Sequence, residues 1–176
     1  MGATRWLDDD EQRTWRTFLI ATRLLLNRLD ADLQHVAAMP MAYYELLVLL
    51  SEAPGRTMRM NELASRSLSK PSRLSHAVNR LEELGWIRRE HAPNDRRGWL
   101  AVLTDEGRAA LEAAAPDHVE SVRAHLLDQL TPAQLKQLGE ISQALLDHLA
   151  PGRRAHSTSP PSGPDHTRHG PDATAS

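Results

Sequence analysis

The chain has 176 residues, of which 40% are hydrophobic and 25% are charged, and this fits one folded domain with or without a tail. The absence of cysteine excludes disulfide frameworks, thiolate catalysis, thiolate-bound zinc and thiol redox sensing. The formal net charge of −2 excludes a uniformly basic chain, and no apolar run approaches the ~18 residues of a membrane span. With its polar, acidic start, the sequence predicts a cytoplasmic protein with no secretory signal and no membrane partner.

A long helix is predicted over residues 8–35. Apolar residues recur at close to helical spacing from Trp15 to Val36, and the acidic start DDDE suits the positive end of a helix dipole. A second helix is predicted over residues 41–53, before a Pro-Gly pair that ends it.

The middle of the chain predicts a helix, a turn and a second, longer helix. Residues 56–60 suit a small strand, residues 61–67 form a short amphipathic pattern, and residues 70–86 form the longer one. Pro71 fits the first turn of the longer helix and Gly85 its end. The residues predicted to form its buried face are Leu74, Ala77, Val78, Leu81 and Leu84.

A β-hairpin is predicted next, from β-type runs at residues 86–92 and 98–104 with the turn-rich stretch PNDRRG between them. Residues 66–97 contain eight basic and four acidic side chains, although the whole chain is slightly acidic. Such local asymmetry favours an anionic partner, and a solvated charged surface is the alternative explanation.

The last part of the chain predicts two further helices and a tail. One helix starts at Asp105 with Thr104 as its cap, and Pro116 is predicted to kink or restart it. The other covers residues 133–150. Residues 151–176 contain five prolines and three glycines and almost no apolar residue, so a disordered tail is predicted.

This order of elements predicts a mainly α fold with a small β wing: a winged helix-turn-helix DNA-binding lobe plus a helical dimerisation domain. The terminal helices carry broad apolar stripes that one chain has no second layer to cover, so a homodimer is expected. The predicted parts are an N-terminal dimerisation helix at 1–38, the winged lobe at 39–104, C-terminal dimerisation helices at 105–150 and the tail at 151–176. In such lobes the second helix enters the major groove of DNA and the wing reaches the neighbouring backbone or minor groove, which accounts for the positive hairpin.

The segment LASRSLSKPSRLSHAVNRLEELGWIRREHAPNDRRGWLAVLTDEG, residues 63–107, resembles the core of the MarR (multiple antibiotic resistance regulator) family. The residues that match its wing signature are Asp95, Arg97, Leu103, Thr104 and Gly107. In element order the resemblance covers residues 10–150. It implies a homodimeric, sequence-specific transcriptional regulator, by family default a repressor, that binds a pseudo-palindromic operator in double-stranded DNA. The half-sites are expected ~34 Å apart.

The resemblance also assigns roles to residues of the DNA-binding lobe. It implies that Arg97 enters the minor groove, that Asp95 braces the wing loop by an ion pair, and that Arg96 contacts phosphate. On the exposed N-terminal part of helix 70–86, the candidates for base edges are Ser72, Arg73 and His76, and those for phosphates are Lys70 and Ser75. Arg80, further along the same side, is predicted to brace the wing or to contact phosphate. Plain surface solvation is the alternative for each of them.

Many proteins of this family release DNA when a small, often aromatic or phenolic, anion binds between the dimerisation helices and the lobes. The residues predicted to line such an effector site are Trp15, Arg16, Phe18, Arg23, Tyr43 and Tyr44. The alternative is that these aromatic side chains belong to the core and that the two arginines are solvated. The lack of cysteine argues against the peroxide-sensing branch of the family.

Three features of the sequence have alternative functional explanations. The stretch SLSK matches the S-x-x-K motif of penicillin-binding proteins but lacks the S-D-N and K-T-G partners, so no enzyme is predicted. A metal-responsive regulator would use His118, His125 and His148, although no carboxylate stands at clear ligand spacing beside them, and neither a metal nor a cofactor is predicted. A winged helix used only for protein contacts is the third alternative.

Overall fold

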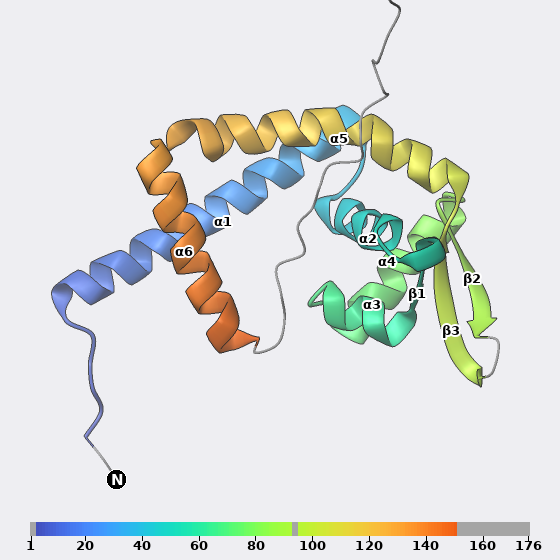
Figure 1. Ribbon diagram of the computed structural model, residues 1–176, viewed down its shortest axis with the longest axis horizontal. Helices are drawn as coiled ribbons and strands as arrows, with labels where there is room; N and C mark the ends of the chain where they lie inside the picture. The colour runs from blue at the N-terminus through green and yellow to red at the C-terminus, as the bar shows by residue number, and fades with distance from the viewer. Residues whose placement is uncertain (1–2, 93–94, 151–176) are drawn as a thin grey trace, which may run out of the picture. The chain divides into compact units, whose positions relative to one another are not determined.

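The computed structural model describes residues 3–92 and 95–150, except the side chains of residues 95–97. The tail predicted at 151–176 therefore lies outside the described residues. Within the described residues the chain divides into two compact units, with the boundary between Ala133 and Gln134. The elements are α1 (Asp9–Ala37), α2 (Met41–Ser51), η1 (Pro54–Arg56), β1 (Thr57–Arg59), α3 (Met60–Arg66), α4 (Pro71–Glu83), β2 (Ile87–Ala92), β3 (Asp95–Leu103), α5 (Asp105–His125), η2 (Leu127–Gln129) and α6 (Pro132–Leu149) (Figure 1). The predicted mainly α fold with a small wing is confirmed.

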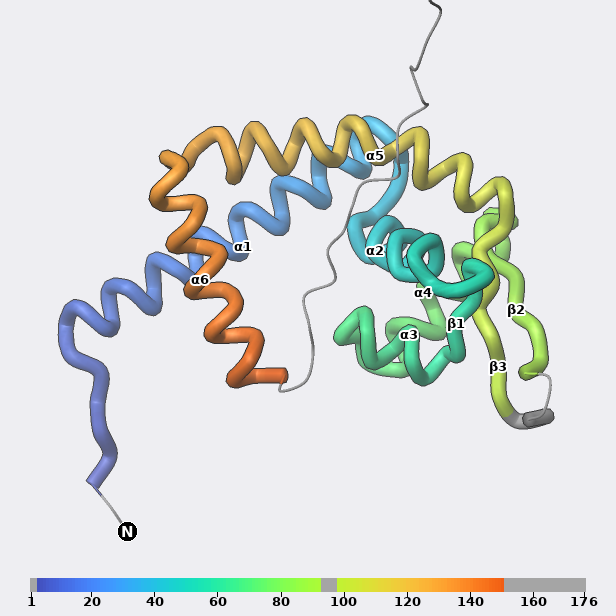
Figure 2. The backbone as a smooth tube through the Cα atoms, viewed as in Figure 1, coloured from blue at the N-terminus to red at the C-terminus, as the bar shows by residue number. Residues whose placement is uncertain are grey.

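Helix α1 begins at a capping box. The Asp8 carboxylate accepts hydrogen bonds from the backbone N–H groups of Asp10 and Glu11, and the Glu11 carboxylate accepts one from the N–H of Asp8. Of its 29 residues only Leu29 and Leu33, near its end, are buried. The C-terminal part of α1, which carries these two leucines, lies beside α5, as the tube in Figure 2 also shows. The rest of α1 has an apolar surface that the first unit leaves exposed.

The core of the first unit lies where α2, α3 and α4 meet the sheet. Fully buried leucines from successive helices, Leu47, Leu63 and Leu81, pack there with Ile87 of β2. On the face of α4 predicted to be buried, Leu74, Val78 and Leu81 are buried as expected and Ala77 is partly buried. Leu84 was predicted wrongly: it is 41% exposed, because it is the C-cap residue and lies beyond the last helical turn that faces the core.

The sheet has three antiparallel strands in the order β1-β3-β2. The small strand predicted from residues 56–60 is present as β1, and Met58 in it pairs with Ala101 of β3. Strands β2 and β3 form the predicted hairpin, with an irregularity in the register between His91 and Ala92. The wing is therefore anchored on both sides of β3.

Helix α5 runs without interruption through Pro116, so the predicted restart of the helix there is wrong. A proline removes one backbone hydrogen bond, which a helix of 21 residues that packs on α1 and α2 tolerates.

Taken singly, none of the described helices is long and apolar enough to cross a bilayer. Only α1 and α2 together meet that criterion, and they are bent by 82° at the break between them.

Candidate nucleic-acid interface

The outward face of α4 collects the residues predicted to contact DNA. Lys70 is the N-cap residue and Pro71 occupies the first turn, while the buried leucine and valine side chains fix the opposite face on the core. The exposed candidates on this face are Lys70, Ser72, Arg73, Ser75 and His76. Within the described part of the chain, none of these five side chains has a hydrogen-bond or ion-pair partner. The structure thus brings them together as a polar surface open to an external partner.

Most other basic side chains of the lobe are paired. Arg66 pairs with Glu62 at 3.0 Å, and Arg88 pairs with Glu90 at 2.7 Å. Arg80 pairs with Glu83 at 2.7 Å, and this hydrogen bond raises the pKa of Arg80 above its ordinary value. Among the basic residues of segment 66–97 whose side chains are described, Lys70 and Arg73 are the ones without an acidic partner.

Arg89, which the sequence did not single out, ties the wing to α4. Its backbone N–H and its Nε donate to the two carboxylate oxygens of Glu82 at 3.2 and 2.9 Å, and its Nη2 donates to Asn79. The bracing role predicted for Arg80 is therefore filled by Arg89, because Arg80 is paired within its own helix. The signal for this was present in RLEELGWIRR, where Gly85 reverses the chain between the two partners.

The wing tip carries the most specific predictions, and their side chains lie outside the described residues. The backbone of Asp95, Arg96 and Arg97 belongs to β3, at the end nearest the turn. The minor-groove role of Arg97, the phosphate contact of Arg96 and the bracing ion pair of Asp95 all stay predictions.

A depression of about 430 Å³ lies between the wing base, the start of α3 and α4. Its polar lining includes Arg59, Asn61 and Ser75, of which only Ser75 was predicted to take part in binding. Trp99, also in the lining, stacks on His91 of the opposite strand with ring centroids 4.0 Å apart. Sequence reasoning missed Arg59, Asn61 and Trp99 because they come from two distant segments that meet only through the pairing of β1 with β3.

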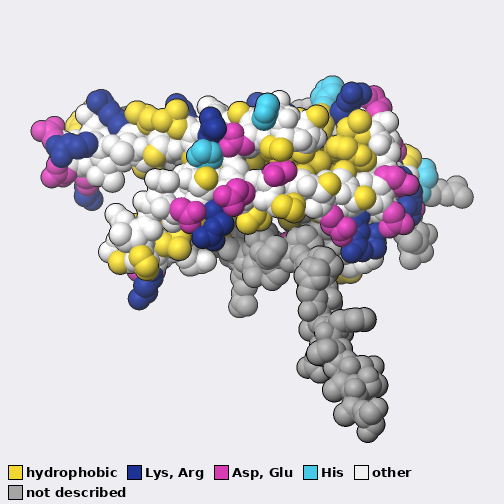
Figure 3. Space-filling view, turned by 90° about the horizontal axis from the view of Figure 1, so that it is seen from above, with side chains coloured by type: hydrophobic (Ala, Val, Ile, Leu, Met, Phe, Trp, Pro, Cys, Tyr) yellow, Lys and Arg dark blue, Asp and Glu magenta, His cyan; other side chains and the backbone are white. Residues whose placement is uncertain are grey.

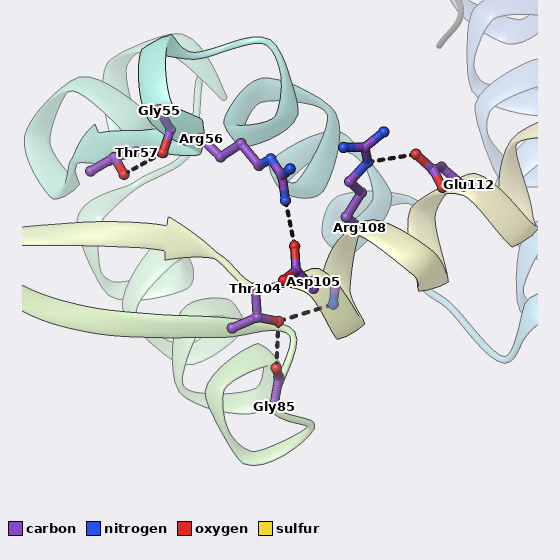
Figure 4. Close-up of polar contacts among 9 residues, drawn as sticks. Gly55, Arg56, Thr57, Gly85, Thr104, Asp105, Arg108 and Glu112 are labelled. Atoms are coloured by element: carbon purple, nitrogen blue, oxygen red, sulfur yellow. Dashed lines mark hydrogen bonds and ion pairs between the residues drawn. The ribbon is translucent and has the colours of Figure 1, made fainter. Parts of the chain in front are cut away.

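The junction between the lobe and α5 explains several residues of the wing signature (Figure 4). Thr104 caps α5 by accepting a hydrogen bond from the N–H of Gly107 at 3.0 Å, and its hydroxyl donates to the carbonyl oxygen of Gly85 at 2.7 Å. A side chain at Gly107 would overlap the carbonyl oxygen of Trp86, so a glycine is required there. Across the junction, Arg56 pairs with Asp105 at 2.7 Å. These contacts set the direction in which α5 leaves the lobe.

The residues predicted for an effector site do not gather within one chain. Trp15 and Phe18 are half exposed on α1, 6.5 Å apart, and the helical rise places Phe18 roughly 16 Å along the axis from Leu29, where α1 meets the core. Tyr44 is buried in the core and Tyr43 is half-buried against it. Arg16 and Arg23 are exposed on α1. The core explanation therefore holds for Tyr44 but not for Trp15 and Phe18.

The three histidines weighed for metal binding have different surroundings. The ring of His118 packs on Tyr44 with centroids 4.5 Å apart, its Nδ1 is buried without a described partner, and burial lowers its pKa. His125 lies 2.9 Å from Asp32, which also accepts a hydrogen bond from Ser121 at 2.8 Å. His148 belongs to α6. Among the described residues, no group of three or more His, Asp or Glu side chains is placed to hold a metal ion.

Fold and surface together define a winged helix-turn-helix protein, with a basic, hydroxyl-rich recognition helix and a braced wing. Comparison with known proteins narrows this class to one family. The profile of the MarR family matches residues 39–98, which span the lobe from the end of α1 into the wing. The chain is 50% identical to Sco3205, a MarR family transcriptional regulator from Streptomyces coelicolor solved in complex with DNA. That match covers 85% of this chain and 94% of the other, with a TM-score of 0.81.

A second structure, of the MarR family regulator AbsC from Streptomyces coelicolor, is 45% identical with a TM-score of 0.77, and the match covers 83% of this chain and 98% of that one. YetL of Bacillus subtilis (strain 168), an HTH-type transcriptional repressor, is 29% identical over 105 residues. This match covers 58% of the present chain and 63% of YetL, slightly less than two thirds of its length.

The chain therefore belongs to the MarR family, whose members are transcriptional regulators and not enzymes. The S-x-x-K match is coincidental, since its serine ends α3 and its lysine caps α4.

Proposed function

We propose that this chain is a sequence-specific DNA-binding transcriptional regulator, and that it acts as a repressor in the cytoplasm. The observation that carries the proposal is the outward face of α4, where Lys70 and Arg73 stand beside three polar side chains with no described internal partner. An unpaired cation on an exposed helix N-terminus suits phosphate, and hydroxyl and imidazole groups suit base edges. The DNA complex of Sco3205 supports DNA as the binding partner, and the description of YetL as a repressor supports repression of transcription.

We further propose that the active form is a homodimer that binds two half-sites of a pseudo-palindrome. Apolar side chains of α1 stay exposed, among them Ile20, Leu24 and Leu26. None of the residues of α6 is buried, although Ile141 and Leu149 are large and apolar, 57% and 76% exposed. Apolar side chains also lie open between charged ones on the face drawn in Figure 3. A second copy of the chain would cover such surfaces and give the pair a two-fold axis that matches the DNA.

The test is DNA binding measured by fluorescence anisotropy at several salt concentrations, with a duplex from upstream of the chain's own gene. We expect tight binding with a steep negative salt slope. Lys70→Gln should reduce the slope by about 1.8 for a dimer, because it removes one phosphate contact per subunit. Arg73→Gln, at a base-edge candidate, should instead reduce the preference for this duplex over an unrelated one. Arg88→Gln is the control in the same lobe: no DNA contact is predicted for it and its charge is paired with Glu90 at 2.7 Å, so the slope should change little.

The predicted wing contact is tested in the same assay. Arg97→Ala should weaken binding strongly while sedimentation velocity still reports a dimer. Equal, weak binding to every duplex, unchanged by Arg97→Ala, would contradict the proposed function and favour the alternative of a winged helix that contacts only proteins. Ile141→Asp, placed on α6, should dissociate the dimer and so weaken binding by the wild-type lobe.

Release of DNA by a small aromatic anion is the last part of the proposal. Tyr44 belongs to the core but is the candidate with a structural reason, since its ring packs on His118, whose buried Nδ1 has no described partner. A ligand that favours the state unable to bind DNA weakens DNA binding by its difference in affinity for the two states. Titration of 4-hydroxybenzoate into the protein–DNA complex should lower the anisotropy, and His118→Phe should reduce that response. An unchanged anisotropy would contradict this class of effector. A metal-responsive regulator would instead release DNA on addition of Zn²⁺.

A further inference from the structure

The turn between α3 and α4 contains a leucine in a conformation that favours glycine. Leu68 has a φ of 54°, and its side chain is 80% exposed. Two backbone hydrogen bonds hold it there: its own N–H donates to the carbonyl of Ser65, and the N–H of Ser69 donates to the carbonyl of Ala64. This is the Schellman arrangement that ends many helices, with Leu68 at the left-handed position.

The end of α4 provides a comparison within the same molecule. There the same pair of bonds runs from Gly85 to Glu82 and from Trp86 to Leu81, and the left-handed position is held by Gly85, with a φ of 74°. A glycine carries no Cβ and accepts this conformation without strain. The chain thus uses glycine at one of two equivalent helix ends and a strained, exposed leucine at the other.

Packing inside the lobe does not offset the strain at Leu68, because its side chain is 80% exposed to solvent. Strained residues that the fold does not need are often found where a molecule binds a partner. Leu68 lies two residues before Lys70, the N-cap of α4, and so at the edge of the surface that carries the unpaired Lys70 and Arg73. A surface with these two cations suits DNA better than an apolar protein partner.

We propose that Leu68 packs against the methyl group of a thymine in the major groove and thereby selects thymine at one position of each half-site. The 5-methyl group of thymine is the apolar group that base pairs display in that groove, and an aliphatic side chain beside a recognition helix is suited to it. The inference rests on the proposed DNA-binding function and adds a specificity-determining residue to it.

The experiment uses the full chain and a duplex that the wild type selects from a randomised library. Each thymine of that duplex is replaced singly by uracil, which removes only the methyl group. At one symmetric pair of positions, uracil should weaken wild-type binding about fourfold per half-site, the effect of one methyl group withdrawn from a contact. Leu68→Ala should bind the thymine duplex more weakly by a similar factor and should not respond to uracil at that position.

Leu84→Ala is the matched control, because Leu84 is an exposed leucine at the opposite end of α4. It should respond to uracil as the wild type does. The inference is overturned if no position distinguishes wild type from Leu68→Ala, or if both lose the same affinity at every uracil. A wild-type chain that selects no duplex would overturn the proposed function and this inference with it. A selected duplex without the Leu68 effect overturns the inference alone.

Discussion

The hydroxyl of Thr104 donates a hydrogen bond to the carbonyl oxygen of Gly85 at 2.7 Å, and this bond joins the start of α5 to the end of α4. The hydroxyl oxygen of Thr104 also accepts a hydrogen bond from the N–H of Gly107, and the N–H of Thr104 donates to the carbonyl oxygen of Trp86 at 3.1 Å. Thr104 therefore connects the end of the recognition helix α4 to the first turn of α5. A movement of α5 would therefore be transmitted directly to the end of α4.

Thr104→Val should lower the free energy of unfolding by about 1 to 3 kcal/mol, because it keeps the shape of the side chain but removes the cap of α5 and the bond to Gly85. Thr104→Ser keeps both hydrogen bonds and serves as the control, with a loss well below that of valine. Urea unfolding followed by circular dichroism measures both. Equal stabilities for the valine and serine variants would show that the hydroxyl contributes nothing.

Gly107→Ala should destabilise the protein by about 1 to 3 kcal/mol, since the added Cβ would overlap the carbonyl oxygen of Trp86 and lie 2.9 Å from Leu103. Backbone cannot yield as a flexible side chain can, so α5 would have to shift away from the lobe. Gly139→Ala is the control in another helix: nothing lies within 4 Å of the position of its Cβ in the described chain, and alanine favours helix there. Thermal unfolding that ranks the two variants in the opposite order would contradict this account.

Leu68→Gly should raise the free energy of unfolding by about 1 kcal/mol, the cost of holding a residue with a Cβ in the left-handed conformation. Leu68→Ala keeps a Cβ and so keeps the strain, and its stability should stay near that of the wild type. Chemical denaturation of the three proteins makes the comparison. If glycine brought no gain over alanine, the turn would not be strained at this residue.

His118→Phe should reduce the loss of stability on mild acidification. Burial lowers the pKa of His118 below its ordinary 6.5, so the folded state favours the neutral ring. The unfolded state then binds more protons than the folded state below pH 6.5, and stability present above that pH is lost as pH falls through the folded pKa. Phenylalanine keeps the ring contact with Tyr44 but cannot take up a proton. Denaturation curves between pH 5 and 8 provide the test, and identical slopes for both proteins would refute it.

Local sequence was sufficient for most elements and for the candidate recognition face. The apolar spacing of Leu74, Val78 and Leu81 predicted both the helix and the side that it buries, because helical periodicity is a property of neighbouring residues. The same spacing implied that Lys70 and Arg73 face outward. Where local signals stop, the predictions lost accuracy: Leu84 lies one residue past the end of the helix, and Pro116 is accommodated by a helix that neighbouring helices support.

Tertiary structure alone decided which charges are available and which distant residues meet. Eight basic side chains in segment 66–97 look equivalent in the sequence, yet Arg80 and Arg89 have acidic partners whereas Lys70 and Arg73 have none among the described residues. Pairing depends on the direction of each side chain in space, which strand register and the turn at Gly85 determine. The strain at Leu68 could not be predicted for the same reason. The hydrogen bonds of the whole turn determine the φ angle of Leu68, and a leucine in the sequence does not indicate it.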